Sequence, residues 1–183
     1  MNKAIMIIAK ICEVGHWIAV GFFTVFVIAL GIGKDELIYQ LSDLNATSSE
    51  IDVNGLTMEA AEGPFSVSAY MIFFIAAIVI CVLTALVFRN LHAAFKTAEG
   101  KTKYSEGKTP FQPAVVKKIK NMGYLCISIP VVQLIFSIII NAMGVGAETS
   151  VGMTGIFLGL IVLALSRFFA YGVELQNDVE GLV

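Results

Sequence analysis

Four long apolar segments alternate with polar ones along the chain. The apolar segments cover residues 14–32, 66–88, 122–143 and 151–169. Each is about long enough to cross a hydrocarbon core of about 30 Å, because an α-helix rises about 1.5 Å per residue. The pattern predicts an all-α integral membrane protein, a bundle of four transmembrane helices forming a single membrane domain over residues 1–183. Residues 4–11 are expected either to lie along the membrane surface or to extend the first helix.

The composition supports this prediction. Hydrophobic residues make up 57% of the chain and charged residues 14%, and the mean hydropathy is +0.84. A soluble domain carries about 45–50% apolar and about 25% charged residues. A water-facing globule of this size cannot bury so much apolar surface. The formal net charge of −2 is less informative, because opposite charges are concentrated in different segments.

The distribution of charge predicts the topology. Residues 89–121 carry eight lysines and arginines against only Glu99 and Glu106, an excess typical of cytoplasmic loops. Residues 34–65 carry seven acidic residues against Lys34 alone, and are predicted to form the outer loop. We therefore expect a multi-pass protein of the cell membrane, with the N-terminus and the acidic tail, residues 170–183, both cytoplasmic.

The outer loop has its own structural signals. Asp35 suits the start of a short helix, and apolar residues alternate on both sides of Asn54-Gly55. An Asn-Gly pair between alternating apolar residues is a strong hairpin signal. The loop is therefore predicted to fold into a small extracytoplasmic cap containing a β-hairpin.

The basic loop, residues 89–121, is bounded by helix signals. Apolar residues recur at helical spacing beyond Phe88, so the second helix is expected to continue past the membrane. Gly100 and Gly107 are predicted to end it. Pro113 fits the first position of the next helix, where its missing N–H costs nothing.

Three polar residues recur every four positions in the third apolar segment: Gln133, Ser137 and Asn141. They share one helix face, and polar groups inside a membrane must find partners. We favour hydrogen bonds between helices as their role. A polar cavity for a ligand or an ion is the alternative.

A second polar group, Lys10, Glu13 and His16, lies near the start of the first transmembrane segment. Its spacing places the three residues on one side of a helix. A structural ion pair near the inner interface is favoured over a functional cluster. With two histidines in the chain and no spacing that supplies three ligands, no metal site or cofactor is predicted. No nucleophile is placed with a base, so an enzyme is not expected.

Small residues mark two helix faces. Gly152, Gly155 and Gly159 lie in the fourth apolar segment, and a similar set of small residues in the second segment comprises Ala77, Cys81 and Ala85. Small residues let helix backbones approach closely. We interpret both sets as packing seams inside the bundle, with homo-oligomerisation as the alternative. The three cysteines are interpreted as small hydrophobic residues.

Two motifs resemble a known family. One is EGKTPFQP at residues 106–113, followed by VKKIKNMGY at residues 116–124; the other is LSRFFAYGVELQ at residues 165–176. With the four apolar segments, they resemble the bacterial membrane family catalogued as domain of unknown function 2975, over essentially the whole chain. The end departs from the family's usual acidic-Asn-Asp-Leu-Thr-Ile, because residues 177–183 read NDVEGLV.

The resemblance implies a context instead of a known activity, because such proteins are often encoded beside a small Cro-like helix-turn-helix regulator. The leading hypothesis is a membrane partner that senses a signal or sequesters that regulator, with membrane lipid as its other partner and no direct nucleic-acid binding. The alternative is a small transporter, channel or immunity-type protein that uses the polar stripe. The candidate docking residues are Pro110, Phe111, Arg167, Tyr171, Gly172, Glu174, Leu175 and Gln176.

Overall fold

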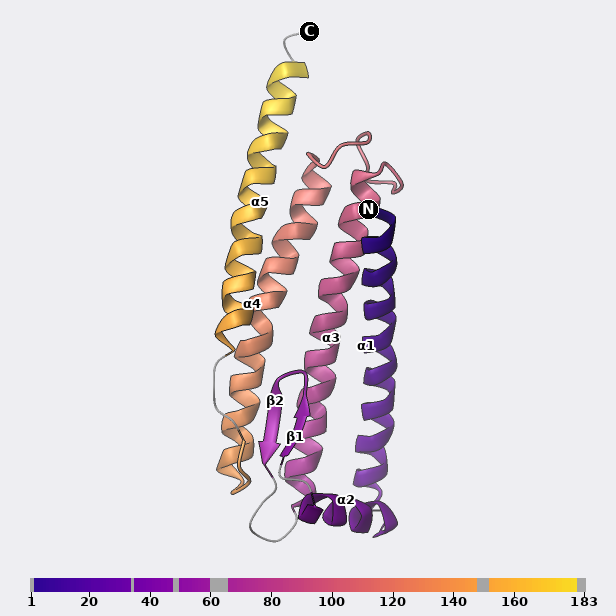
Figure 1. Cartoon of the computed structure of the whole chain (residues 1–183), viewed down its shortest axis with the longest axis vertical. Coiled ribbons are helices and arrows are strands. Elements are labelled where there is room, and N and C mark those ends of the chain that lie inside the picture. The colour runs from indigo at the N-terminus through magenta and orange to yellow at the C-terminus, as the bar shows by residue number, and fades with distance from the viewer. Residues whose placement is uncertain (1, 34, 48–49, 60–65, 148–151, 181–183) are drawn as a thin grey trace. The chain divides into compact units, whose positions relative to one another are not determined.

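The structure is a computed structural model that describes residues 2–33, 35–47, 50–59, 66–147 and 152–180. It is mostly helical (Figure 1). The elements in chain order are α1 (Asn2–Gly31), α2 (Asp35–Thr47), β1 (Glu50–Val53), β2 (Leu56–Glu59), α3 (Val67–Ala98), α4 (Pro113–Ala142) and α5 (Met153–Glu180).

Four of these helices, α1, α3, α4 and α5, are long and apolar enough to cross a membrane, as the sequence predicted. They contain 30, 32, 30 and 28 residues, respectively. At about 1.5 Å per residue each is longer than a hydrocarbon core of about 30 Å. Residues 4–11 belong to α1, so of the two arrangements expected for them, an extension of the first helix is the one observed.

The predicted helix ends are also observed. The chain turns at Gly100, whose φ of 76° lies in the left-handed region that favours glycine, directly after α3. Pro113 is the first residue of α4. α2 begins at Asp35 and has Asp35 and Glu36 in its first turn, where negative charge is favourable.

The chain divides into two compact units. We call one the hairpin unit, comprising His16–Val82 and Ile129–Gly152, and the other the loop unit, comprising Met1–Gly15, Leu83–Ser128 and Met153–Val183. Helices α1, α3 and α4 contribute residues to both, whereas all of α5 belongs to the loop unit. Each unit is described by itself.

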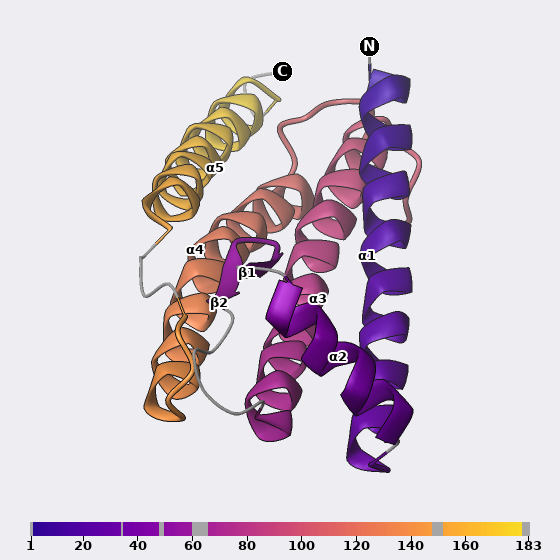
Figure 2. The ribbon, with the colours of Figure 1, turned by 60° about the horizontal axis from the view of Figure 1, so that its bottom comes forward.

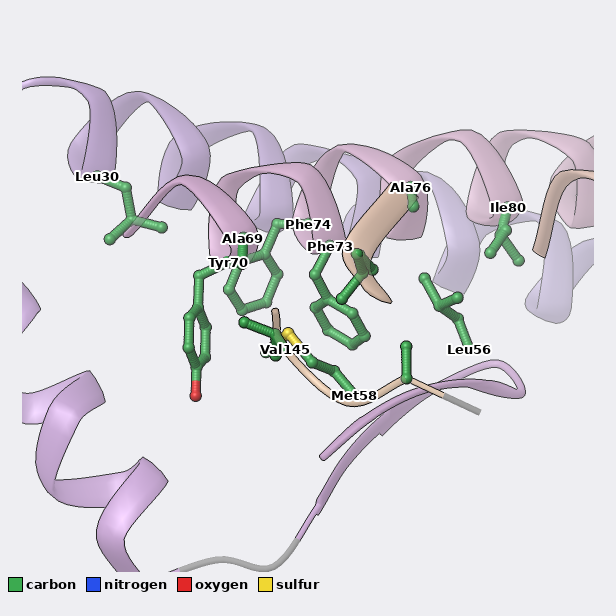
Figure 3. Close-up of a cluster of buried hydrophobic side chains, with 12 residues drawn as sticks. Leu30, Leu56, Met58, Ala69, Tyr70, Phe73, Phe74, Ala76, Ile80 and Val145 are labelled. Carbon is green, nitrogen blue, oxygen red and sulfur yellow. The ribbon is translucent and has the colours of Figure 1, made fainter. Parts of the chain in front are cut away.

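The hairpin unit contains the predicted β-hairpin. Strands β1 and β2 pair in an antiparallel register, with Val53 opposite Leu56. Asn54 and Gly55 form the turn with φ values of 52° and 79°, as a type I′ turn requires. The side chains of Leu56 and Met58 are 1% exposed and join the core cluster with Phe73 of α3 (Figure 3).

The hairpin lies alongside α3 and α4 instead of forming a cap beyond their ends, which corrects the position expected from the sequence (Figure 2). Asn54 Nδ2 donates to Cys81 Sγ at 3.5 Å. Cys81 is about 21 Å along α3 from Val67, at about 1.5 Å per residue. The alternating pattern explains this placement, because it gives the hairpin an apolar face that the helices bury.

The edge of β2 that faces away from β1 is paired as well. Met58 forms an antiparallel bridge with Ala147, and Glu59 N donates to Gly146 O at 2.7 Å. Backbone polar groups away from water need such partners. α2 runs across the ends of α1 and α3, and its Leu37 packs against the core (Figures 1 and 2).

In the loop unit, α4 and α5 approach closely at two glycines. A Cβ atom added to Gly159 would lie 2.5 Å from Ile127 Cγ1 and 2.8 Å from Gly123 O. Gly159 is therefore part of a packing seam, as predicted, and its partner Gly123 was not singled out from the sequence. Gly152 precedes α5 and has ordinary contacts, so the three glycines do not form one stripe on a helix.

Candidate functional site

The structure brings the two motifs of the loop unit together. Thr109 Oγ1 donates to Gln176 Oε1 at 3.2 Å, and the Phe111 and Phe169 ring centroids are 5.8 Å apart. A Cβ atom added to Gly172 would lie 2.4 Å from Phe111 Cδ1. Glycine at position 172 therefore allows the Phe111 ring to lie directly against the α5 backbone.

Gln112 organises the segment before α4. Its side chain is 1% exposed, and its Oε1 accepts a hydrogen bond from Glu106 N at 2.9 Å. Its Nε2 donates to Gly107 O at 3.2 Å and to Thr109 O at 2.6 Å. The sequence analysis did not assign Gln112 a role. The sequence did contain a signal for its role: Gln112 stands between Pro110 and Pro113, which donate no backbone hydrogen bond.

α5 presents an exposed apolar face near its C-terminus. Beyond the predicted fourth membrane segment, Tyr171, Leu175 and Val179 recur at helical spacing and are between 47% and 63% exposed. Arg167 and Glu174, which were also predicted to dock a partner, are exposed on the same helix. Exposed apolar side chains grouped on one helix face are typical of an interaction surface.

Pro110 differs from the other candidate docking residues because it also lines an apolar cavity of about 240 Å³ within the loop unit. The cavity lies between α3, α4 and α5, and Phe169 contributes to it as well. Residues that hold Phe111 against α5 thus also border this space.

The polar stripe of α4 is bonded within the hairpin unit, and the bonds described there differ from the expected ones. Gln133 Nε2 donates to Asn54 O of the hairpin turn at 2.7 Å. Asn141 Nδ2 donates to Ala147 O at 2.8 Å, and Asn141 Oδ1 accepts from Ala147 N at 2.9 Å. Ser137 is buried. The two amides thus bond backbone groups of non-helical segments, where hydrogen bonds between helices had been favoured.

Lys10 and Glu13 form the ion pair favoured by the sequence analysis. Lys10 Nζ donates to Glu13 Oε2 at 3.0 Å, and Glu13 is 7% exposed. His16 is half-buried on the same helix. Among the described residues, no group of three or more His, Cys, Asp or Glu side chains is placed to hold a metal ion.

Comparison of the chain with protein-family models, with curated proteins and with solved structures found no match. The resemblance to the family catalogued as domain of unknown function 2975 therefore remains a prediction based on the two motifs.

Proposed function

We propose that this chain is a multi-pass protein of a bacterial cell membrane that captures a small cytoplasmic helix-turn-helix regulator. The observation that carries the proposal is the contact between the two motifs. Phe111 packs against Gly172, and Thr109 bonds Gln176, so the basic loop and the C-terminal part of α5 form one surface. Charge asymmetry alone requires neither contact, whereas a docking surface built from two segments requires both.

The exposed face of α5 supports the same role. Tyr171 is 61% exposed and Leu175 is 47% exposed, and both follow Arg167, which marks the inner end of the fourth apolar segment. An amphipathic helix or an apolar groove of a partner would bury such a face. Tyrosine is also enriched among the residues that dominate binding energies.

The acidic residues of the tail favour this class of partner. Glu174 and Asp178 are exposed on α5 beyond Arg167. A protein that binds DNA carries a basic surface for the phosphates. Acidic side chains beside an apolar face would attract that surface and compete with DNA for it.

This proposal places the basic loop and both termini in the cytoplasm. A protease added outside intact cells should cleave near Glu50 and spare the segment around Lys101. The opposite cleavage pattern would contradict both the topology and the docking surface, because the regulator is cytoplasmic.

The capture experiment uses nanodiscs containing the full chain and a purified small Cro-like helix-turn-helix protein, the kind of partner that the family resemblance implies, with binding measured by biolayer interferometry. Replacing Tyr171 and Leu175 together by alanine should weaken binding at least tenfold, because a few buried apolar side chains carry most of an interface's energy. Glu174→Gln should weaken binding less and reduce its salt dependence. Gln176→Ala should weaken it by releasing Thr109.

The matched control replaces Phe22 and Val25 together by alanine, because both are apolar residues on α1 with exposed fractions of 64% and 68%. Binding should then be unchanged. Equal binding by the Tyr171/Leu175 variant and the unmodified chain would remove α5 from the proposed surface.

The alternative of a transporter or channel receives less support from the polar stripe. The side-chain amides of Gln133 and Asn141 bond the backbone of the hairpin turn and of Ala147. These bonds give the two residues a role in fixing non-helical segments to α4.

A further inference from the structure

A basic cavity of about 450 Å³ lies between the N-terminal turns of α1 and the C-terminal end of α3, within the loop unit. Four lysines line it: Lys3 and Lys10 from α1, Lys96 from α3, and Lys101 from the segment that follows. No acidic residue is among the residues that line this cavity.

Two sets of hydrogen bonds build the cavity. His92 Nδ1 lies 3.1 Å from Met6 O, and because a carbonyl oxygen only accepts, Nδ1 carries the hydrogen and joins α3 to α1. At the end of α3, Lys101 N donates to Lys96 O and Gly100 N donates to Thr97 O, both at 3.0 Å. These are the two bonds of a Schellman motif, and they turn the chain so that Lys101 returns toward Lys96.

The lysines carry more charge than their acidic neighbours neutralise. Lys10 is paired with Glu13 at 3.0 Å, and Lys101 is paired with Glu99 at 2.5 Å. Two carboxylates thus accompany four ammonium groups around one cavity. Like charges held close together repel, so an anion with more than one negative oxygen would be bound favourably there.

The same cavity has an apolar side. Met6, Ile7 and Ile11 line it, and Ile7 and Ile11 are 59% and 65% exposed. A small inorganic anion would gain nothing from these side chains. An amphiphile with a phosphate group and hydrocarbon chains would contact both kinds of lining.

We propose that this cavity binds the headgroup of an anionic phospholipid, with the lysine ammonium groups on the phosphate oxygens and Ile7 and Ile11 against the acyl chains. Basic pockets between helices on the cytoplasmic side of a membrane recognise such headgroups. The site is formed by the N-terminal turns of α1 and the C-terminal end of α3. Lipid binding there does not depend on capture of a regulator.

The test is native mass spectrometry of the full chain in detergent, titrated separately with phosphatidylglycerol, cardiolipin and phosphatidylcholine. Both anionic lipids should bind more tightly than phosphatidylcholine. The Lys3→Gln/Lys96→Gln variant should bind the anionic lipids roughly 30-fold more weakly, from about fivefold for each lysine removed. Lys3→Arg/Lys96→Arg should retain binding, because it keeps the charge.

The matched control is Lys103→Gln/Lys117→Gln, which removes the same charge from two exposed lysines that do not line the cavity. Its affinity for the anionic lipids should stay within about twofold of the unmodified chain, a smaller change than loss of one lining lysine. Equal losses in the two glutamine variants would show general surface attraction and overturn the site. Displacement of the lipid by millimolar inorganic phosphate would show that phosphate alone is recognised, and would overturn the lipid assignment.

Discussion

The hairpin unit and the loop unit use their polar side chains in different ways. In the hairpin unit, polar side chains fix non-helical backbone to helices, as Gln133 does for the hairpin turn, and apolar side chains such as Leu56 are buried. In the loop unit, lysines gather around a cavity, whereas large apolar side chains are exposed in both units, as Phe22 and Tyr171 are. The difference teaches that polar side chains attach the hairpin in one unit and concentrate positive charge in the other.

The hairpin explains part of this difference. α5 belongs wholly to the loop unit, so the hairpin unit contains segments of α1, α3 and α4 together with the hairpin and α2. The side chains of Leu56 and Met58 give those helices an apolar surface to pack against. A structural role for the hairpin follows from this packing.

A pair of leucines, one in each unit, tests the comparison with the largest expected effect. Leu56→Ala should lower the free energy of unfolding by about 2–5 kcal/mol, because it empties a buried site. Leu175→Ala, at a side chain 47% exposed, should change it by less than about 0.5 kcal/mol. The measurement for both variants is reversible unfolding in mixed micelles. Similar costs would contradict the burial of the hairpin.

A pair of glycines tests the contact between α4 and α5. Gly159→Ala should cost about 1–3 kcal/mol of unfolding free energy, because the new Cβ would meet Ile127 and the backbone of Gly123. Gly21→Ala on α1 is the control, since nothing lies within 4 Å of its added Cβ. It should be neutral or slightly stabilising, because alanine has the higher helix propensity. A neutral Gly159→Ala would mean that the two helices do not approach closely.

Gln133→Met tests the attachment of the hairpin turn. Methionine has a similar side-chain volume but does not donate to Asn54 O, so the free energy of unfolding should fall by about 1 kcal/mol. Hydrogen exchange at the backbone amides of β1 and β2 should become faster. The control Gln40→Met removes an exposed bond to Glu36 within α2 and should leave that exchange unchanged. Unaltered hairpin exchange in both variants would show that packing alone holds the turn.

The smallest effect is expected at the contact between the two motifs. Thr109→Val removes the donor to Gln176 Oε1 and should lower the free energy of unfolding by about 0.5–1 kcal/mol. The segment around Lys108 should then be cleaved faster by trypsin. Thr154→Val, at an exposed position near the start of α5, should leave the cleavage rate unchanged. Equal rates in both variants would show that the bond does not order the loop.

Much of the fold could be read from local patterns. Apolar segments of sufficient length predicted the four long helices, Asn54-Gly55 predicted the hairpin turn, and Pro113 predicted the start of α4. These features depend on backbone geometry and hydrophobic periodicity over a few residues. Both motifs were also identified from the sequence, but the bond between Thr109 and Gln176 was not, because it joins residues 67 positions apart.

Sequence by itself determined which segments are acidic, basic or apolar and where the four long apolar helices lie, since each of those properties belongs to the residues in question; it did not predict that α5 continues to Glu180. Tertiary structure alone decided that the hairpin lies beside Cys81, that Phe111 covers Gly172, and that Lys3 and Lys96 share a cavity. The physical reason is that burial and charge clustering depend on which distant segments meet. In this chain, the apolar face of the hairpin packs along the sides of the helices instead of beyond their ends.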